Sequence, residues 1–364
     1  MTPWTALRGT RPEPPRRNAT ERHTTYTPLM TAVPCVDWQV AAATGGLLVP
    51  PGIDLDRAAV GAAVDDLRAC AERAVTAVAV AAKLPAPPSA QVWIVGRATW
   101  VRAATDMARA MLTAVGQQPP VALGEKVGAR LAGLQLGSAF AFVATRILGQ
   151  FDPYSATPRL LLVAPNIVAA ERAMGVEPHG FRQWVCLHEQ THRAQFHAAP
   201  WLPEHLLGLM AQLFDANDDA DAGASGHAAP PAARTATGPA ARLMSPAQLT
   251  TFDRITAVMS LLEGHAEVMM DRAAPGLVPQ IDRLRASMEQ RRDAAGPMQL
   301  LSRLLGLRAK REQYLHGATF CRAVIDRAGP ATLNLALAAP HLLPDLPELY
   351  EPQRWLGRVS QQVA

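Results

Sequence analysis

The sequence predicts a mainly α-helical (α+β) single domain with a small β-sheet. Long segments repeat apolar residues three and four positions apart, which is typical of helices packed on a core. Only two short apolar runs are typical of strands, and no internal repeat is found. The 364 residues, of which 49% are hydrophobic and 18% charged, suffice for one large core. This composition excludes a disordered chain, a coiled coil and a disulfide-stapled mini-protein.

The first half of the ordered chain is expected to begin near Val36-Asp37-Trp38, after a disordered tail over residues 1–33 that is rich in Pro, Thr and Arg. Strands are expected at residues 91–95 and 159–163. Helices are expected at residues 55–82, 100–115, 121–148, 167–174 and 181–199, and Gly137 can interrupt the third of these.

The second half follows a flexible insertion at residues 217–244, which holds Asp, Gly, Ala and Pro and almost no large apolar residue. Ser245, Pro246 and Gln248 then form a capping-box signature that opens a helix running to about Asp271. A further helix is expected at about 300–326, followed by loops punctuated by proline. The domain would therefore consist of two parts, residues 34–216 and 245–360.

Charge and cysteine content indicate the compartment and the partners. The net charge is +4, but residues 1–33 carry five Arg and two Glu, so most of the basic excess lies in the tail and nucleic-acid binding is not expected. Four cysteines lie far apart, which favours reduced thiols. With no signal-peptide core and no uninterrupted apolar stretch approaching 18 residues, we expect a cytoplasmic protein without a membrane partner.

A histidine cluster contains the most informative motif, His188-Glu189-Gln190-Thr191-His192, an HExxH. On a helix, the two histidines lie four residues apart on one face, about 5–6 Å apart at Cβ, and can share one Zn²⁺ ion. Glu189 is rotated about 100° from His188 and can act as general base on a zinc-activated water. The alternative is a pair of surface histidines that flank a solvated glutamate.

A third zinc ligand is expected in the helix that begins after Ser245. Glu263 and Glu267 share one helix face, whereas His265 lies about 200° away, so one zinc ion can recruit either the glutamate face or His265. Gly264 favours Glu263, because a glycine there permits close approach of another helix. Glu267 would then orient a ligating histidine. His265 as the ligand is the alternative.

These motifs carry a resemblance to known families. An HExxH followed by a helix with Glu-Gly-x-Ala is similar to the gluzincin metallopeptidases. Residues 34–360 more closely resemble a family of zincin-like proteins of high-GC bacteria, described as zinc-dependent metalloproteases and in some cases associated with biosynthesis of a deazaflavin coenzyme. The stretches that carry it are 36–38, 48–52, 148–152, 187–196, 200–202, 262–267 and 314–320.

The resemblance implies His188 and His192 as zinc ligands, Glu189 as catalytic base and Glu263 as third ligand. It does not supply a substrate, and we expect a peptide or protein of unknown identity. The chain departs from the best-known gluzincins in spacing, since 71 residues separate His192 from Glu263. Tyr314 is the candidate that stabilises the transition state. The sequence thus predicts a zinc-dependent hydrolase, a metallopeptidase; the alternative is a non-catalytic helical protein with structural zinc that binds a partner.

Overall fold

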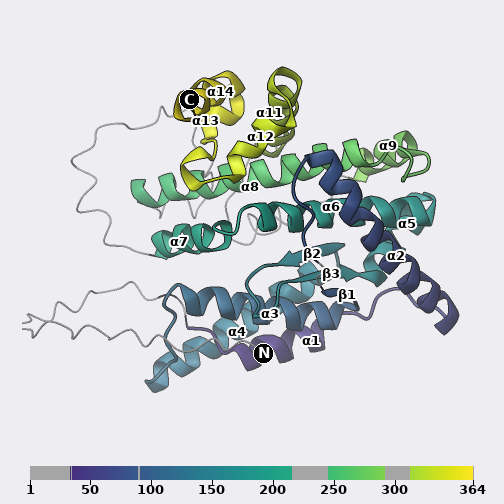
Figure 1. The fold of residues 1–364 in the computed structure, drawn as a ribbon. Helices are drawn as coiled ribbons and strands as arrows, with labels where there is room; N and C mark the ends of the chain where they lie inside the picture. Colours follow the sequence, from purple (N-terminus) through teal and green to yellow (C-terminus); the bar gives the residue numbers. More distant parts are fainter. Residues whose placement is uncertain (1–32, 34, 89–90, 215–244, 292–311, 364) are drawn as a thin grey trace, which may run out of the picture.

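The computed structural model describes residues 33, 35–88, 91–214, 245–291 and 312–363. Within them helices dominate, and a three-stranded sheet lies between helical layers (Figure 1), which confirms the mainly α class with a small sheet. Apart from Val33, the expected tail lies outside the described residues, as does the insertion expected at 217–244.

The sheet has the strand order β1-β3-β2, so β2 is an edge strand. The two predicted strands, β1 (Gln91–Val95) and β3 (Arg159–Val163), pair in parallel, with Val92 opposite Leu160. β2 (Gly149–Asp152) runs antiparallel to β3, with Gly149 opposite Leu162. The central strand is apolar from Leu160 to Val163 and fully buried, because helices cover both of its faces.

One face of the sheet packs against α3 (Arg97–Ala114) and α4 (Leu123–Ala144), with α1 (Trp38–Leu48) against both helices. The opposite face packs against α2 (Arg57–Ala82), α5 (Ala164–Met174) and α6 (Pro178–Ala198). Side chains of β3 alternate between the two cores: Leu161 and Val163 join the first, and Leu162 joins the second.

A second layer of helices covers the side of α6 turned away from the sheet. α8 (Pro246–Ala273) lies between α6 and α11 (Glu312–Ala328), as Figure 1 shows. Ser245 caps α8 through a capping box with Gln248, as predicted. The other elements of this part are α7 (Leu202–Phe214), α9 (Ile281–Arg291), α12 (Pro330–Leu333), η4 (Asn334–Leu337), η5 (Pro340–Leu342), α13 (Leu346–Tyr350) and α14 (Pro352–Val363).

Two expectations about these elements are wrong. The proline-punctuated end of the chain forms short helices instead of loops, because its prolines stand in the first turns, where the missing N–H has no helical partner. The helix expected at 121–148 ends at Ala144, and Gly137 does not interrupt it. A side chain at Gly137 would meet the backbone of α1 at Ala41 and Gly45, so this glycine allows the two helices to touch.

Candidate metal centre

The predicted HExxH helix is α6. Glu177 caps its N-terminus, since its carboxylate accepts hydrogen bonds from the backbone N–H groups of His179 and Gly180, and Pro178 occupies the first turn. No glycine or proline interrupts the helix after Gly180. Because α6 packs against α2, α8 and the sheet, its second half is fixed on several sides.

The structure brings His188, His192 and Glu263 together. The Nε2 atoms of the two histidines lie 3.1 Å apart, and each lies 3.7 Å from one carboxylate oxygen of Glu263. All three side chains are partly exposed, from 15% for His192 to 38% for Glu263, so solvent and a ligand can reach them. Glu263 comes from α8, on the far side of the insertion region, and completes a group of three possible metal-ligating side chains.

Gln195 fixes the orientation of His192. The Gln195 amide nitrogen donates to the backbone oxygen of Leu262 (2.8 Å) and lies 3.0 Å from Nδ1 of His265, so its amide oxygen faces His192 Nδ1, also at 3.0 Å. His192 must therefore donate through Nδ1–H, which leaves Nε2 unprotonated and directed at Glu263 and His188. A metal-ligating histidine needs this tautomer.

Glu189 is only 6% exposed, and its carboxyl is near enough to Glu263 for the two charges to interact. Burial raises the pKa of its carboxyl to about 8, and the negative charge of Glu263 adds to the effect. The backbone of Gly149 at the start of β2 lies directly against it, because a β-carbon at Gly149 would stand 2.6 Å from Cγ and Cδ of Glu189. A carboxyl with a pKa near neutral can both accept and return a proton.

The free edge of β2 lies beside this carboxyl. The Val163 N–H donates to the Leu148 oxygen, and the alternation of an antiparallel pair then turns the backbone N–H and C=O groups of Gly149 and Phe151 away from β3. The Phe151 ring packs against Phe196 of α6, 5.6 Å between centroids, which ties this edge to the HExxH helix. Among the described residues no backbone group pairs with this edge, where Gly149 is buried and Phe151 is partly exposed.

Close contact between α8 and α11 supports Glu263. A β-carbon at Gly264 would overlap the backbone of Gly317 and Ala318, and one at Gly317 would overlap the Ser260 carbonyl. The close helix approach predicted from Gly264 is therefore present. This packing against α11 restricts the movement of the α8 backbone next to Glu263.

The other candidate residues have different surroundings. His265 is buried away from the group, and burial followed by the charge of His192 lowers its pKa to about 4, so it supports Gln195 as a neutral ring. A carboxylate oxygen of Glu267 accepts a hydrogen bond from Arg322 (2.9 Å), while Gln195 takes the orienting role at His192. Tyr314 lies in the first turn of α11, and its side chain is outside the described part of the chain.

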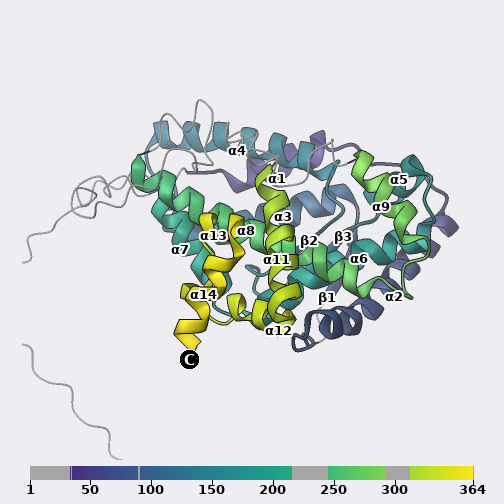
Figure 2. The same ribbon diagram turned by 90° about the horizontal axis from the view of Figure 1, so that it is seen from above.

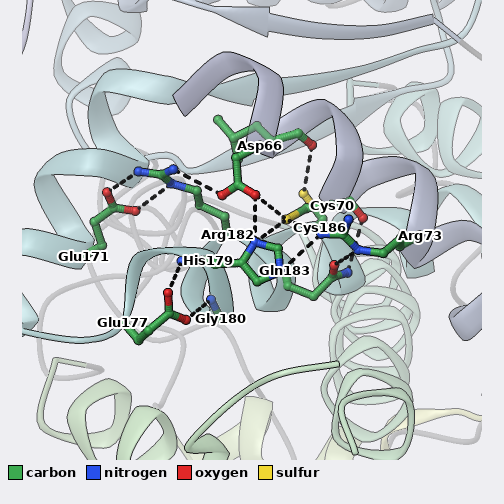
Figure 3. Close-up of polar contacts among 11 residues, drawn as sticks. Asp66, Cys70, Arg73, Glu171, Glu177, His179, Gly180, Arg182, Gln183 and Cys186 are labelled. Atoms are coloured by element: carbon green, nitrogen blue, oxygen red, sulfur yellow. Dashed lines mark hydrogen bonds and ion pairs between the residues drawn. The ribbon is translucent and has the colours of Figure 1, made fainter. Parts of the chain in front are cut away.

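A second cluster of possible metal ligands lies further back along α6 (Figure 3), formed by Asp66, Cys70 and His179. These side chains already satisfy one another. His179 Nδ1 lies 2.7 Å from an Asp66 oxygen, and Arg73 donates to His179 Nε2 and to the Cys70 sulfur. Arg182 bonds the other Asp66 oxygen, and burial raises the pKa of Cys70 to about 12. The cluster links α2 to α6 through hydrogen bonds and ion pairs.

The first group fits zinc. Tetrahedral zinc with bonds of about 2.0–2.2 Å separates nitrogen and oxygen ligands by about 3.3–3.5 Å. The observed separations of 3.1, 3.7 and 3.7 Å differ from this by a few tenths of an ångström. Two imidazoles and one carboxylate are also a ligand set that catalytic zinc uses, with one position left for water.

Gln195 and Gly149 are the site residues that sequence reasoning did not assign. Gln195 follows His192 by three positions, which puts it on the same helix face, and this spacing was the available signal. Nothing in the sequence around Gly149 indicates that it meets Glu189, because the two belong to elements that only the tertiary fold brings together.

Comparisons with known proteins agree with this geometry. No curated protein matches the chain. The chain is similar to a solved structure from Chloroflexus aurantiacus, described as a proposed hydrolase with a novel fold. The two are 25% identical, with a TM-score of 0.68, over 89% of this chain and 99% of the other. The profile of a family described as zincin-like metallopeptidase matches residues 36–356. The chain therefore belongs to the zincin-like metallopeptidase family.

Proposed function

We propose that this protein is a zinc-dependent peptidase in which His188, His192 and Glu263 hold one Zn²⁺ ion and Glu189 is the general base. The observation that carries the proposal is the meeting of three ligand atoms within 4.8 Å of one another beside a buried carboxyl. Family membership supports the coarser conclusion, a hydrolase that binds zinc.

The chemistry follows from the positions of these side chains. Zinc, when bound, polarises the scissile carbonyl and lowers the pKa of water. Glu189 takes a proton from the attacking water and returns it to the leaving amine. Gln195 holds His192 in the ligating tautomer. Gly149 leaves room for the Glu189 carboxyl.

The edge strand supports a peptide as the substrate. An extended peptide can pair with the outward N–H and C=O groups of the partly exposed Phe151, as in other cases where a strand is added to a sheet edge. Pairing there would run the peptide past Glu189, because Gly149 touches that carboxyl. A small substrate without a peptide backbone would not use this edge.

The test uses elemental analysis and hydrolysis of a mixed peptide library. We expect one zinc per chain in the wild type, loss of zinc in His188→Ala, and retained zinc with no hydrolysis in Glu189→Gln. His197→Ala is the matched control, because His197 is exposed on the same helix. Full activity of Glu189→Gln would refute the general base. Zinc bound by a wild type that cleaves no peptide would favour a structural zinc in a partner-binding protein.

A further inference from the structure

The outer surface formed by α1 and α4 is apolar and has no described element over it. Large apolar side chains with 46% to 85% of their area exposed gather there, and they make up most of the exposed large apolar residues found in the described ranges. We call this the α1–α4 surface, and its residues are Leu47, Leu48, Val121, Leu123, Val127, Leu131, Leu134 and Phe142.

The helix pattern explains why this surface faces outward. α4 turns a row of small residues, Ala129, Gly133, Gly137 and Ala141, inward, and the two glycines touch the backbone of α1. Val127, Leu131 and Leu134 recur four and three positions apart on another face. Figures 1 and 2 show α4 at the outside of the molecule in both views.

This arrangement is unusual for a helix of a protein core. By length and composition, α4 is the one helix among the described residues that is apolar enough to cross a membrane, yet only 28% of that stretch is buried. Glu125, Lys126 and Arg130 interrupt the apolar run of this helix in the sequence, which is why no membrane partner is expected from the sequence alone. An exposed apolar patch of this extent marks a site of interaction.

The charges around the patch favour an anionic partner. Lys126, Arg130 and Arg146 are exposed along α4 and at its end, and the Arg146 guanidinium lies 3.7 Å over the Phe142 ring. The single acidic residue of α4, Glu125, accepts hydrogen bonds from the backbone N–H groups of Val121 and Ala122. Arg130 also lies 4.0 Å from a carboxylate oxygen of Asp37, so three basic and two acidic side chains flank the apolar face, and the balance of charge is basic.

The basic segment at residues 1–32 joins the fold at the same place. It carries five arginines and two glutamates, and the chain enters the described structure at buried Val33. The Asp37 N–H then donates to the Ala129 oxygen of α4. An apolar helix face combined with a cluster of basic residues provides the two contributions that hold peripheral proteins on anionic bilayers.

A second copy of the chain fits these charges less well. If two α4 helices met about a two-fold axis in antiparallel fashion, Lys126 of each would lie towards Arg146 of the other. In a parallel arrangement, Arg130 would face its own counterpart. Both arrangements bring like charges together at the rim of the contact, although Glu125 offsets part of this repulsion in the first and Asp37, which lies near Arg130, part of it in the second.

We propose that the α1–α4 surface is where this protein lies on an anionic lipid bilayer, with α4 parallel to the membrane. Val127, Leu131 and Leu134 enter the boundary between headgroups and acyl chains, while Lys126 and Arg130 contact the phosphates. The glycine-lined inner face of α4 stays packed on α1. Binding at this surface is separate from the chemistry at His188 and does not depend on it.

The test is flotation of the full-length protein with vesicles of phosphatidylcholine alone or mixed with phosphatidylglycerol. The test variant is Val127→Ser/Leu131→Gln/Leu134→Gln, and the matched control is Val60→Ser/Val80→Gln, which changes exposed apolar residues of α2. We expect flotation with the mixed vesicles, a loss of affinity of roughly tenfold or more in the α4 variant, and wild-type affinity in the control.

Several outcomes would overturn the proposal. They are an absence of flotation with either vesicle, equal binding to both vesicles, or an equal loss in the α2 control. A wild-type dimer that the α4 variant converts to monomer, without any vesicle binding, would identify the surface as an interface between copies of this chain. Melting curves check that each variant remains folded, which we expect because all replaced side chains are at least 45% exposed.

Discussion

Replacing Gly149 with alanine should separate catalysis from stability at this site. The new β-carbon would stand 2.6 Å from Cγ and Cδ of Glu189, whereas ordinary contact begins at 3.4 Å. The Glu189 carboxyl must therefore retreat by about 0.8 Å. The φ angle of Gly149 is not among the positive values, so the backbone itself accepts alanine.

The two consequences differ in size. A general base displaced by about 1 Å loses on the order of a hundredfold in rate, so kcat/KM should fall by about that factor. Stability should change by only about 1 kcal/mol, because the atoms that move belong to a side chain and not to the backbone. Zinc content should stay at the wild-type value, because the ligating atoms belong to other side chains.

The assay is hydrolysis of the best peptide found in the library, together with zinc analysis and thermal unfolding. Gly208→Ala is the control, because Gly208 lies in helix α7 with no atom within 4 Å of the added β-carbon. It should keep full activity and gain up to about 1 kcal/mol from reduced backbone entropy. If Gly149→Ala hydrolyses the peptide as fast as the wild type while holding zinc, Glu189 does not work from the observed position and the reasoning is refuted.

Three further predictions concern stability and metal binding. Gly264→Ala should lower the free energy of unfolding by about 1–3 kcal/mol, because its β-carbon would overlap the backbone of α11. Gly61→Ala is the control and should not lower it, because Gly61 faces open space. Equal melting temperatures of the two variants would contradict this prediction. Burial raises the pKa of Asp66, but the hydrogen bonds from His179 and Arg182 outweigh it, so the net pKa is lowered. Asp66→Asn should therefore destabilise the protein above about pH 4, which is the pKa of this carboxyl in the unfolded chain. In urea unfolding, the difference in stability between variant and wild type should vanish as the pH falls through the pKa of Asp66 in the folded protein. A difference that stays constant with pH would refute the ion-pair account. Gln195→Leu should weaken zinc binding by about 10–100-fold in competition with a chelator, and unchanged affinity would show that Gln195 does not orient His192.

Sequence reasoning located the candidate site as far as helix geometry determines it. The HExxH spacing places His188 and His192 on one face of any helix, and Gly264 indicated the close approach of another helix beside Glu263. The structure brings these three residues together. The choice between Glu263 and His265 depended on which face of α8 meets α6, and that depends on tertiary packing.

The fold was predictable where local signals are strong. The capping box at Ser245 gave the start of α8, and the apolar run Leu160 to Val163 gave the central strand. Strand β2 escaped prediction because its four residues, from Gly149 to Asp152, show too short a pattern and gain their conformation from pairing with β3. Helix α1 was missed because Gly45 and Gly46 weaken its local preference, although Gly45 packs against α4 and α3.

The separation of the ligands along the chain has a consequence for synthesis in the cell. His188 and His192 leave the ribosome well before Glu263, which follows 71 residues later. At about 5–20 residues per second, the nascent chain spends roughly 4–14 seconds with two of the three ligands. Even then α11, whose backbone presses on Gly264, has still to be made. The three ligands can therefore come together only after Glu263 has been made, and the packing that supports Glu263 forms only after α11 has followed.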